Sequence, residues 1–246
     1  MLVSVNAGRH PARSKLAFAL DYPTLAEAER GAAPLVDSVG VLKVGLELFV
    51  SEGPRAIELG ERLGCDVFLD LKLHDIPETV ERAVAAAARH GARYLTIHAA
   101  GGPAMLEAAA KRAERENSGL ILLAITVLTS LDSEDLTAIG VNAAPREQAL
   151  RLARLARDHG VPGMVCSAAE VASLRAELGP EFMLVTPGIR PQANQADDQK
   201  RTSGPAAAIS AGSSLLVVGR PIRDAVDPAA AARAISDEIH RASTLA

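Results

Sequence analysis

The stretch Val67–Pro77, which reads VFLDLKLHDIP, joins an apolar run typical of a buried strand to a segment that begins like a helix. Three charged side chains, those of Asp70, Lys72 and Asp75, fall within its last eight positions. If the strand continues through Lys72, the two-residue spacing puts Asp70 and Lys72 on the same face. Exposed ion pairs are common at strand ends, so this stretch alone leaves both a surface pair and a functional pair open.

Similar apolar runs recur along the whole chain and predict eight strands. Most of them are continuous, as expected of parallel strands that are covered on both faces. We predict strands at Leu16–Leu20, Val41–Val44, Val67–Leu71, Tyr94–Ile97, Leu120–Val127, Gly163–Val165, Met183–Val185 and Leu215–Val218. The segments between them are rich in Ala, Glu, Arg and Leu, and predict helices at Thr24–Val36, Pro54–Leu63, Pro77–His90, Pro103–Glu116, Pro145–His159, Ala168–Leu178, Gly204–Ala211 and Asp227–Ala242.

This alternation of strands and helices predicts an α/β fold, the (β/α)8 or TIM barrel, whose typical length is about 250 residues. A doubly wound open sheet is the alternative, but it usually shows a GxGxxG fingerprint after the first strand. Here the first run ends in Leu20-Asp21-Tyr22-Pro23, with no GxGxxG, which favours the barrel. We find no internal linker. The sequence therefore predicts a single barrel domain over residues 15–246, preceded by a flexible N-terminal extension over residues 1–14.

Composition and charge exclude several classes of function. The chain has 246 residues, of which 48% are hydrophobic, so a sizeable core is available. Its net charge of −4 argues against nucleic acid as the main partner. No apolar stretch is long enough for a membrane span, and the N-terminus has no apolar core of signal-peptide length. Cys65 and Cys166 show no CxxC spacing and are predicted to be free thiols. We therefore expect a cytoplasmic protein that binds no membrane.

Polar residues gather at the carboxyl ends of the predicted strands, where barrel active sites lie. Each has a simple alternative explanation, such as a cap, a turn residue or a lysine that extends to solvent. Metal binding by His98 is disfavoured, because no second His or Cys shares its spacing. The residues at these strand ends are Asp21, Lys43, Asp70, Lys72, His98, Thr129, Ser130, Arg190, Gly219 and Arg220. The concentration of two lysines and two or three carboxylates at one end of the barrel is what predicts an active site.

Two loops predict a phosphate site. Pro187–Arg190 follows the seventh predicted strand and Gly219–Arg220 follows the eighth. Barrels often bind phosphate through backbone N–H groups in these loops, and arginine adds a charge-assisted contact. An exposed arginine is the simple alternative in each loop. The polar run Pro191–Thr202 is predicted to be a mobile lid, from which Gln199 or Arg201 reaches the phosphate.

Taken together, these motifs resemble the orotidine 5′-phosphate decarboxylase family of the bacterial type. The resemblance extends from Lys15 to about Arg241 and its motifs occur in the family's order. The seven motifs are Leu20-Asp21, Lys43-Val44-Gly45, Phe68–Pro77, His98–Gly102, Leu128-Thr129-Ser130, Val185–Arg190 and Val218-Gly219-Arg220.

The resemblance implies a reaction without cofactor or metal, in which orotidine 5′-phosphate loses CO2 and gives uridine 5′-phosphate, the last step of de novo pyrimidine nucleotide synthesis. It implies that Lys43, Asp70, Lys72 and Asp75 form an alternating network of charges. Lys72 is then the proton donor to C6. Asp75 is expected to enter the site from the second subunit of a homodimer with shared active sites.

The same resemblance implies how the substrate is held. Asp21 and Lys43 hold ribose hydroxyls, with help from Thr79 of the neighbouring subunit. Asp70 lies beside the substrate carboxylate and Thr129 beside the pyrimidine. The phosphate is contacted by Arg190, Gln199, Gly219 and Arg220.

Two other functions compete with this one. A metal-dependent sugar-phosphate lyase, such as 3-keto-L-gulonate 6-phosphate decarboxylase or hexulose-phosphate synthase, shares a related D-x-K-x-x-D on the same scaffold. Lys43 stands where those enzymes are expected to offer a metal-binding carboxylate, and Glu47 lies further along. The second competitor is a non-catalytic nucleotide-phosphate binder that kept the barrel. The intact Asp70, Lys72 and Asp75 argue against it.

Overall fold

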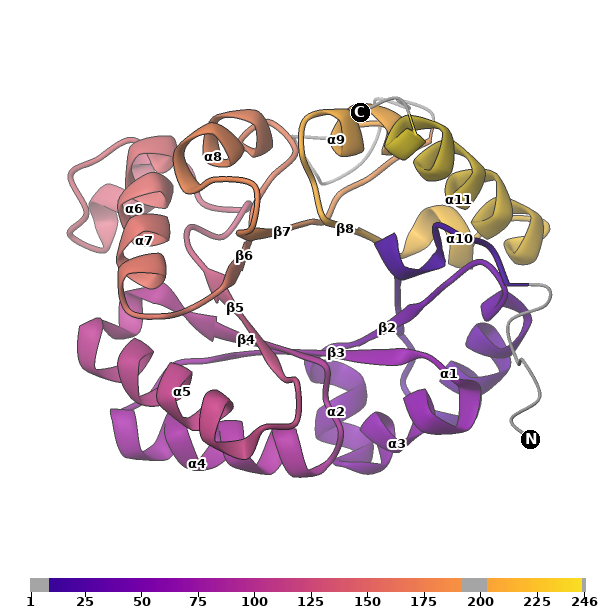
Figure 1. The fold of residues 1–246 in the computed structure, drawn as a ribbon, viewed down its shortest axis with the longest axis horizontal. Coiled ribbons are helices and arrows are strands. Elements are labelled where there is room, and N and C mark those ends of the chain that lie inside the picture. Colours follow the sequence, from indigo (N-terminus) through magenta and orange to yellow (C-terminus); the bar gives the residue numbers. More distant parts are fainter. Residues whose placement is uncertain (1–8, 192–202, 245–246) are drawn as a thin grey trace.

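Eight parallel strands close into a barrel, with neighbours in the order β1 to β8 and β8 paired back to β1 (Figure 1). A computed structural model of the chain describes residues 9–191 and 203–244. The predicted (β/α)8 TIM barrel is therefore confirmed. The strands are β1 (Leu16–Ala19), β2 (Val41–Val44), β3 (Asp66–Leu73), β4 (Tyr94–His98), β5 (Ile121–Ile125), β6 (Gly163–Val165), β7 (Met183–Thr186) and β8 (Leu215–Val218).

Helices surround the barrel and complete each strand–helix unit (Figure 1). They are α1 (Leu25–Ala32), α2 (Leu46–Glu52), α3 (Arg55–Leu63), α4 (Pro77–Arg89), α5 (Pro103–Glu116), α6 (Ser133–Ala138), α7 (Pro145–Asp158), α8 (Val171–Leu178), α9 (Pro205–Ser210), α10 (Arg220–Arg223) and α11 (Pro228–Thr244). All predicted elements are present. Several have shifted ends, whereas β2, β6, β8 and α5 have the predicted bounds. The short helices α2 and α6 were not predicted, and each lies in a segment that follows a strand.

Two of these differences from the prediction have a clear local cause. The predicted helix Thr24–Val36 ends as an α-helix at Ala32 and tightens into a 3₁₀ turn over Ala33–Leu35, which contains Pro34. Proline lacks the N–H that would continue the α-helical pattern. The unpredicted α6 begins with a capping box between Asp132 and Asp135, which stabilises even a short helix at its N-terminus.

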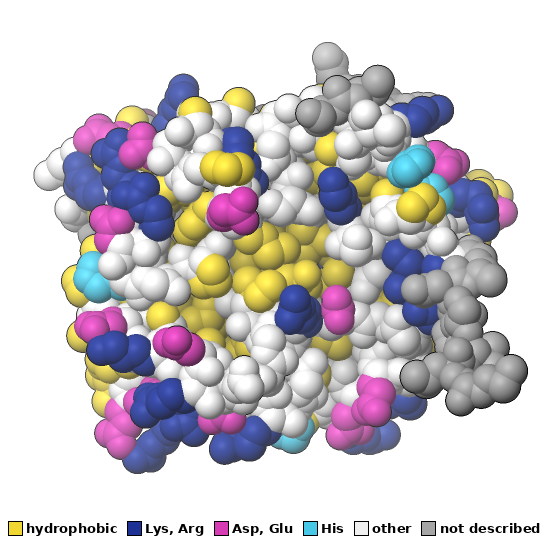
Figure 2. Space-filling model, viewed as in Figure 1, with side chains coloured by type: hydrophobic (Ala, Val, Ile, Leu, Met, Phe, Trp, Pro, Cys, Tyr) yellow, Lys and Arg dark blue, Asp and Glu magenta, His cyan; other side chains and the backbone are white. Residues whose placement is uncertain are grey.

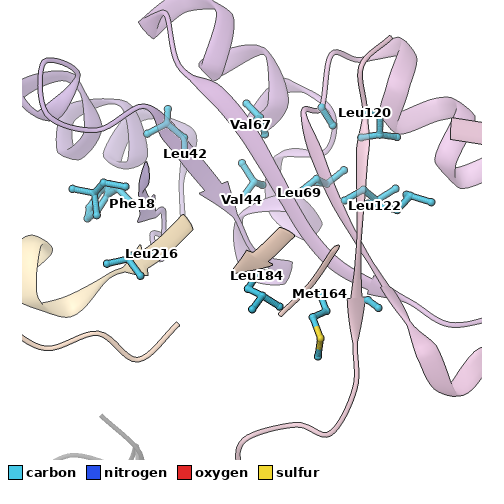
Figure 3. Packing of buried hydrophobic residues seen from close by; sticks show 14 of the residues in the cluster. Phe18, Leu42, Val44, Val67, Leu69, Leu120, Leu122, Met164, Leu184 and Leu216 are labelled. Carbon is cyan, nitrogen blue, oxygen red and sulfur yellow. The ribbon is translucent and has the colours of Figure 1, made fainter. Parts of the chain in front are cut away.

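Side chains of each strand alternate between the barrel interior and the layer beneath the helices. Two separate hydrophobic clusters result. The larger one, between strands and helices, includes Phe18, Leu42, Val44, Val67 and Leu69 (Figure 3). The smaller one fills the interior with Ala17, Ala19, Val41, Phe68, Tyr94, Leu123, Val185, Leu215 and Val217. A space-filling view shows hydrophobic side chains across the middle of the ring, and most charged side chains around it (Figure 2).

This alternation places the first polar interior side chains near the carboxyl ends of the strands. Lys43 comes two residues after Val41, Asp70 two after Phe68, and Thr96 two after Tyr94. Each therefore continues the interior face of its strand, on the C-terminal side of the apolar layer. On β2, β3 and β4 the interior thus changes from apolar packing to a polar site within two residues.

Strand β3 is irregular at the point where the site begins. Leu69 pairs with Leu95 of β4, but the next registered pair is Leu73 with Ile97, so β3 carries two more residues than β4 over this interval. Lys72 lies inside this bulge with a φ of 52°, in the left-handed region. Bulges redirect side chains at barrel rims and near active sites.

The joint between β7 and β8 has the shortest pairing in the barrel. The two strands are in register at Val185–Leu215 and Thr186–Leu216, whereas β4 and β5 pair along their full length. The guanidinium of Arg175 on α8 strengthens this joint, because it donates hydrogen bonds to loops that lead into both strands. Its acceptors are the carbonyls of Gly179, Pro180, Phe182 and Gly212 and the hydroxyl of Ser214.

The predicted N-terminal extension is described from residue 9 onward, and residues 1–8 lie outside the described residues. In the described part, Arg13 donates hydrogen bonds to the carbonyls of Val36, Val39 and Gly64, so this part is attached to the segments that precede β2 and β3. The flexibility of the extension stays a prediction. None of the described helices is long and apolar enough to cross a membrane.

Candidate active site

Four of the predicted charged side chains form a continuous series at the mouth of the barrel, here called the charge quartet: Asp21, Lys43, Asp70 and Lys72. The Nζ atom of Lys72 lies 2.9 Å from Oδ1 of Asp70. Oδ2 of Asp70 lies 3.8 Å from Nζ of Lys43, which lies 3.7 Å from Oδ1 of Asp21. The charges therefore alternate in sign along the series.

Burial within the quartet is greatest at its centre. The side chains of Lys43 and Asp70 are 14% and 15% exposed, while that of Lys72 is 32% and that of Asp21 49% exposed. Charges that are withdrawn from water to this extent need close partners of opposite sign. The centre of the quartet meets that need, and its two ends remain open to a ligand.

Sequence reasoning missed Thr96, which is fully buried on β4 beside the quartet. Its hydroxyl accepts a hydrogen bond from the backbone N–H of Lys72 at 2.8 Å and donates one to Oδ1 of Asp70 at 3.1 Å. The available signal was its interior position two residues before His98. Threonine is so common in strands that this position did not stand out.

His98 and His74 lie close to the same site, with ring centroids 5.2 Å apart. Burial lowers the pKa of His98 below its ordinary value of 6.5, and the neighbouring His74 and Lys72 lower it further, against the opposing effect of Asp70. His98 is therefore a neutral side chain near neutral pH. In the described part of the chain, no three His, Cys, Asp or Glu side chains are grouped so that they could hold a metal ion.

Asp75 does not join the quartet of its own subunit. It is exposed, and its Oδ1 accepts the backbone N–H of Ile76 at 2.6 Å. Among the described residues of one chain, no ion pair connects Asp75 with Lys72 or Lys43. Thr79 is also exposed, in the first turn of α4. Both residues face away from the protein interior just beyond β3.

The predicted phosphate residues follow the last two strands. Gly219 lies beside the quartet, because a Cβ atom added to it would come 3.4 Å from Oδ2 of Asp21. Arg220 begins α10 directly after it, and Arg190 is half-buried in the loop that follows β7. Thr129 is exposed in the loop that follows β5. Gln199, Arg201 and the rest of the predicted lid from residue 192 to 202 lie outside the described residues.

This arrangement suits chemistry in which negative charge develops on a bound ligand. A partly exposed ammonium held against a carboxylate offers both a preorganised positive charge and a proton. The loops after β7 and β8 lie where barrels commonly bind phosphate. The fold and the site together define a barrel enzyme whose charged groups surround a small-molecule site at the carboxyl ends of the strands.

Comparison with known proteins gives the family. The chain belongs to the orotidine 5′-phosphate decarboxylase / HUMPS family, whose model matches residues 14–235. The family that the seven motifs predicted is thereby confirmed.

Relatives and a solved structure agree with this membership. A protein of Anaeromyxobacter sp. (strain K) is 54% identical over 222 residues, covering 90% of this chain and 96% of its own. One of Chromohalobacter salexigens is 53% identical over 224 residues, covering 91% and 95%. Both are named orotidine 5′-phosphate decarboxylase. The crystal structure of orotidine 5′-phosphate decarboxylase from Lactobacillus acidophilus superposes with a TM-score of 0.80 at 36% identity, covering 92% of this chain and 99% of that one.

Proposed function

We propose that this chain converts orotidine 5′-phosphate to uridine 5′-phosphate and CO2, the last step of de novo pyrimidine nucleotide synthesis. The observation that carries the proposal is the charge quartet, in which Nζ of Lys72 lies 2.9 Å from Asp70, in a member of this family. Both free cysteines agree with work in the cytoplasm, where thiols stay reduced.

In the proposed reaction, the bond between C6 and the carboxylate breaks, its electron pair stays on C6, and CO2 leaves. The ammonium of Lys72 stabilises that pair as it forms and then transfers a proton from Nζ to C6. Asp70 lies beside the departing carboxylate, so repulsion between two negative groups is relieved as CO2 becomes neutral. Lys43, between Asp70 and Asp21, keeps the series of charges in place.

We propose that the rest of the substrate is held around this centre. Asp21 and Lys43 bind ribose hydroxyls, and Thr129 lies against the pyrimidine. Arg190, Gln199, Gly219 and Arg220 bind the phosphate. Binding energy from the distant phosphate is then available to orient the reacting ring against the charges.

A spectrophotometric decarboxylation assay tests this function. We expect turnover by the wild-type enzyme that a chelator does not change. Lys72→Ala removes a proton donor and a charge aimed at the reacting atom, each of which contributes about 10²-fold or more. We therefore expect a loss of about 10⁴-fold or more, with binding of uridine 5′-phosphate largely retained.

The control is Lys111→Ala, which removes an exposed lysine of α5 paired with Glu107. We expect wild-type turnover from it. Near-normal turnover by Lys72→Ala removes Lys72 as the proton donor. No turnover of orotidine 5′-phosphate, together with magnesium-dependent decarboxylation of 3-keto-L-gulonate 6-phosphate, favours the metal-dependent sugar-phosphate lyase instead.

We also propose a homodimer in which Asp75 and Thr79 complete the partner's site. The proposal is supported by the exposure of Asp75 away from its own quartet and by Ile76, an apolar side chain beside it that is 65% exposed. Leu46 and Val50, which follow β2, are also exposed hydrophobic residues. A two-fold interface over this end of the barrel would cover such residues and bring each Asp75 toward the other subunit.

Complementation between inactive variants tests the shared site. When Asp75→Asn and Lys72→Ala subunits exchange, a heterodimer has one site with both changes and one intact site, if Asp75 acts across the interface. We expect recovery to about half of wild-type activity per heterodimer, by that count of sites. Mixing Asp70→Asn with Lys72→Ala is the control, and it should stay inactive because both residues belong to one subunit's site. Demonstrated exchange without recovery in the first mixture places Asp75 in its own subunit's site.

A further inference from the structure

We infer that Thr96 is a positioning residue, whose buried hydroxyl sets the relative placement of the Lys72 ammonium and the Asp70 carboxylate. The inference rests on the proposed function, because it assigns Thr96 a part in the geometry of that reaction. It is carried by a closed set of hydrogen bonds around the bulge in β3.

The bulge gives the backbone of Lys72 an unusual environment. Lys72 adopts a left-handed conformation, which is unfavourable for a side chain with a Cβ atom. Because β3 carries two extra residues between Leu69 and Leu73, regular pairing with β4 is interrupted there. The N–H of Lys72 is instead donated to the Thr96 side chain at 2.8 Å. Thr96 therefore satisfies a backbone group that the bulge takes out of the ladder.

The direction of the second hydrogen bond follows from the first. A hydroxyl has one proton to donate. Since Oγ1 of Thr96 accepts from the N–H of Lys72, its proton is free for Oδ1 of Asp70, 3.1 Å away. The same Oδ1 atom also receives Nζ of Lys72 at 2.9 Å. A ring of contacts thus runs from the Lys72 backbone through Thr96 and Asp70 to the Lys72 side chain.

This ring selects one arrangement of the charges. It holds Oδ1 of Asp70 against Thr96 and Lys72, and leaves Oδ2 for Lys43 at 3.8 Å. Thr96 is fully buried, so bulk water does not replace its hydroxyl when the hydroxyl is lost. Without it, both the lysine backbone and the aspartate lose a fixed partner. The expected result is a mispositioned proton donor, and small displacements of a catalytic group reduce rates strongly.

Paired variants separate this role from a role in folding. Thr96→Val keeps the branched shape and removes the hydroxyl, while Thr96→Ser keeps the hydroxyl. Thr186→Val is the matched control. Thr186 is also a fully buried threonine in a strand, on β7, and its hydroxyl is 2.7 Å from that of Ser213. Each valine variant removes a buried hydroxyl from a strand, but only Thr96 touches the charge quartet.

The measurements are kcat and KM for orotidine 5′-phosphate, affinity for uridine 5′-phosphate, and the thermal midpoint. For Thr96→Val we expect kcat to fall by about a hundredfold with product affinity little changed. For Thr96→Ser we expect most of the wild-type kcat, and for Thr186→Val a lower midpoint with wild-type kcat. If Thr96→Val does not fold, the comparison of Thr96→Ser with Thr96→Ala again contrasts hydroxyl present with hydroxyl absent.

The outcomes distinguish the two proposals. Equal kcat values for the Thr96 and Thr186 valine variants overturn the inference, whether both are high or both are low. A Thr96→Ser enzyme as slow as Thr96→Val also overturns it, because the hydroxyl is then not what matters. A wild-type enzyme that does not decarboxylate orotidine 5′-phosphate overturns the proposed function itself.

Discussion

The Arg175 side chain gives a quantitative prediction about how the barrel is closed. Its guanidinium donates to the carbonyls of Gly179, Pro180 and Phe182 before β7, and to Gly212 and Ser214 before β8. The Ser214 hydroxyl in turn accepts the backbone N–H of Leu184 in β7. One side chain therefore holds together the entry to the two strands with the shortest pairing.

Arg175→Met keeps much of the length and apolar stem of the side chain and removes all of these donors. A hydrogen bond from a charged group contributes about 1.5–3 kcal/mol, and bonds from one group are not additive. Because the side chain is half-buried, water can replace some of the lost partners. We therefore expect the free energy of unfolding to fall by about 3 kcal/mol. For a chain of this size that corresponds to a drop in thermal midpoint of about 6–12 °C.

Urea unfolding followed by circular dichroism measures the change, with calorimetry for the midpoint. Arg151→Met is the matched control, since Arg151 forms an exposed pair with Glu147 on α7 and such pairs contribute little. Arg175→Lys should be intermediate, because one ammonium cannot reach acceptors in both loops as a planar guanidinium does. If Arg175→Met is as stable as Arg151→Met, the claim that Arg175 strengthens the β7–β8 joint is wrong.

Two predictions concern titratable groups. The pKa of His98 is lowered in the folded state, so as the pH falls the imidazole is protonated in the unfolded chain before it is protonated in the folded protein. Protonation therefore favours the unfolded chain. The free energy of unfolding of the wild type should fall more between about pH 7.5 and pH 5.5 than that of His98→Asn. The measurement is urea denaturation at both pH values. An equal decrease in the free energy of unfolding for the wild type and His98→Asn would contradict this. Burial raises the pKa of the Cys166 thiol to about 12, so in a Cys65→Ser protein Ellman's reagent should react quickly only after unfolding. Rapid reaction of the native Cys65→Ser protein would show that Cys166 is accessible.

Much of the fold is visible in the sequence because strand and helix patterns differ strongly in an α/β barrel. Continuous apolar runs such as Leu215–Val218 identified buried parallel strands, and Ala-rich segments such as Pro103–Glu116 identified the covering helices. The short helices were missed for a physical reason. Leu46–Glu52 and Ser133–Ala138 are too brief to show a clear helical period and are stabilised mainly by their surroundings. They also lack the Ala-rich composition that identified the equally short Pro205–Ser210.

The candidate site was predicted in part. The closeness of Asp70 and Lys72 was expected from regular strand alternation, yet the structure achieves it through a bulge and a left-handed Lys72. A bulge has no distinct sequence pattern here, so Thr96, its partner, was not identified. A role for Asp75 across a subunit interface depends on a second chain, which the pattern of one chain does not describe.

The closure of β8 onto β1 has a consequence for synthesis of the protein on the ribosome. Lys43, Asp70, Lys72 and Thr96 lie on consecutive strands, so all four have been synthesised once β4 is complete. Gly219, the neighbour of Asp21, is made more than a hundred residues later, with the last strand. The residues that carry the reactive charges are thus synthesised early, whereas the wall beside Asp21 is synthesised only when nearly the whole chain is complete. Until β8 has been synthesised and paired with β1, these charged residues lack the enclosure that the closed barrel gives them.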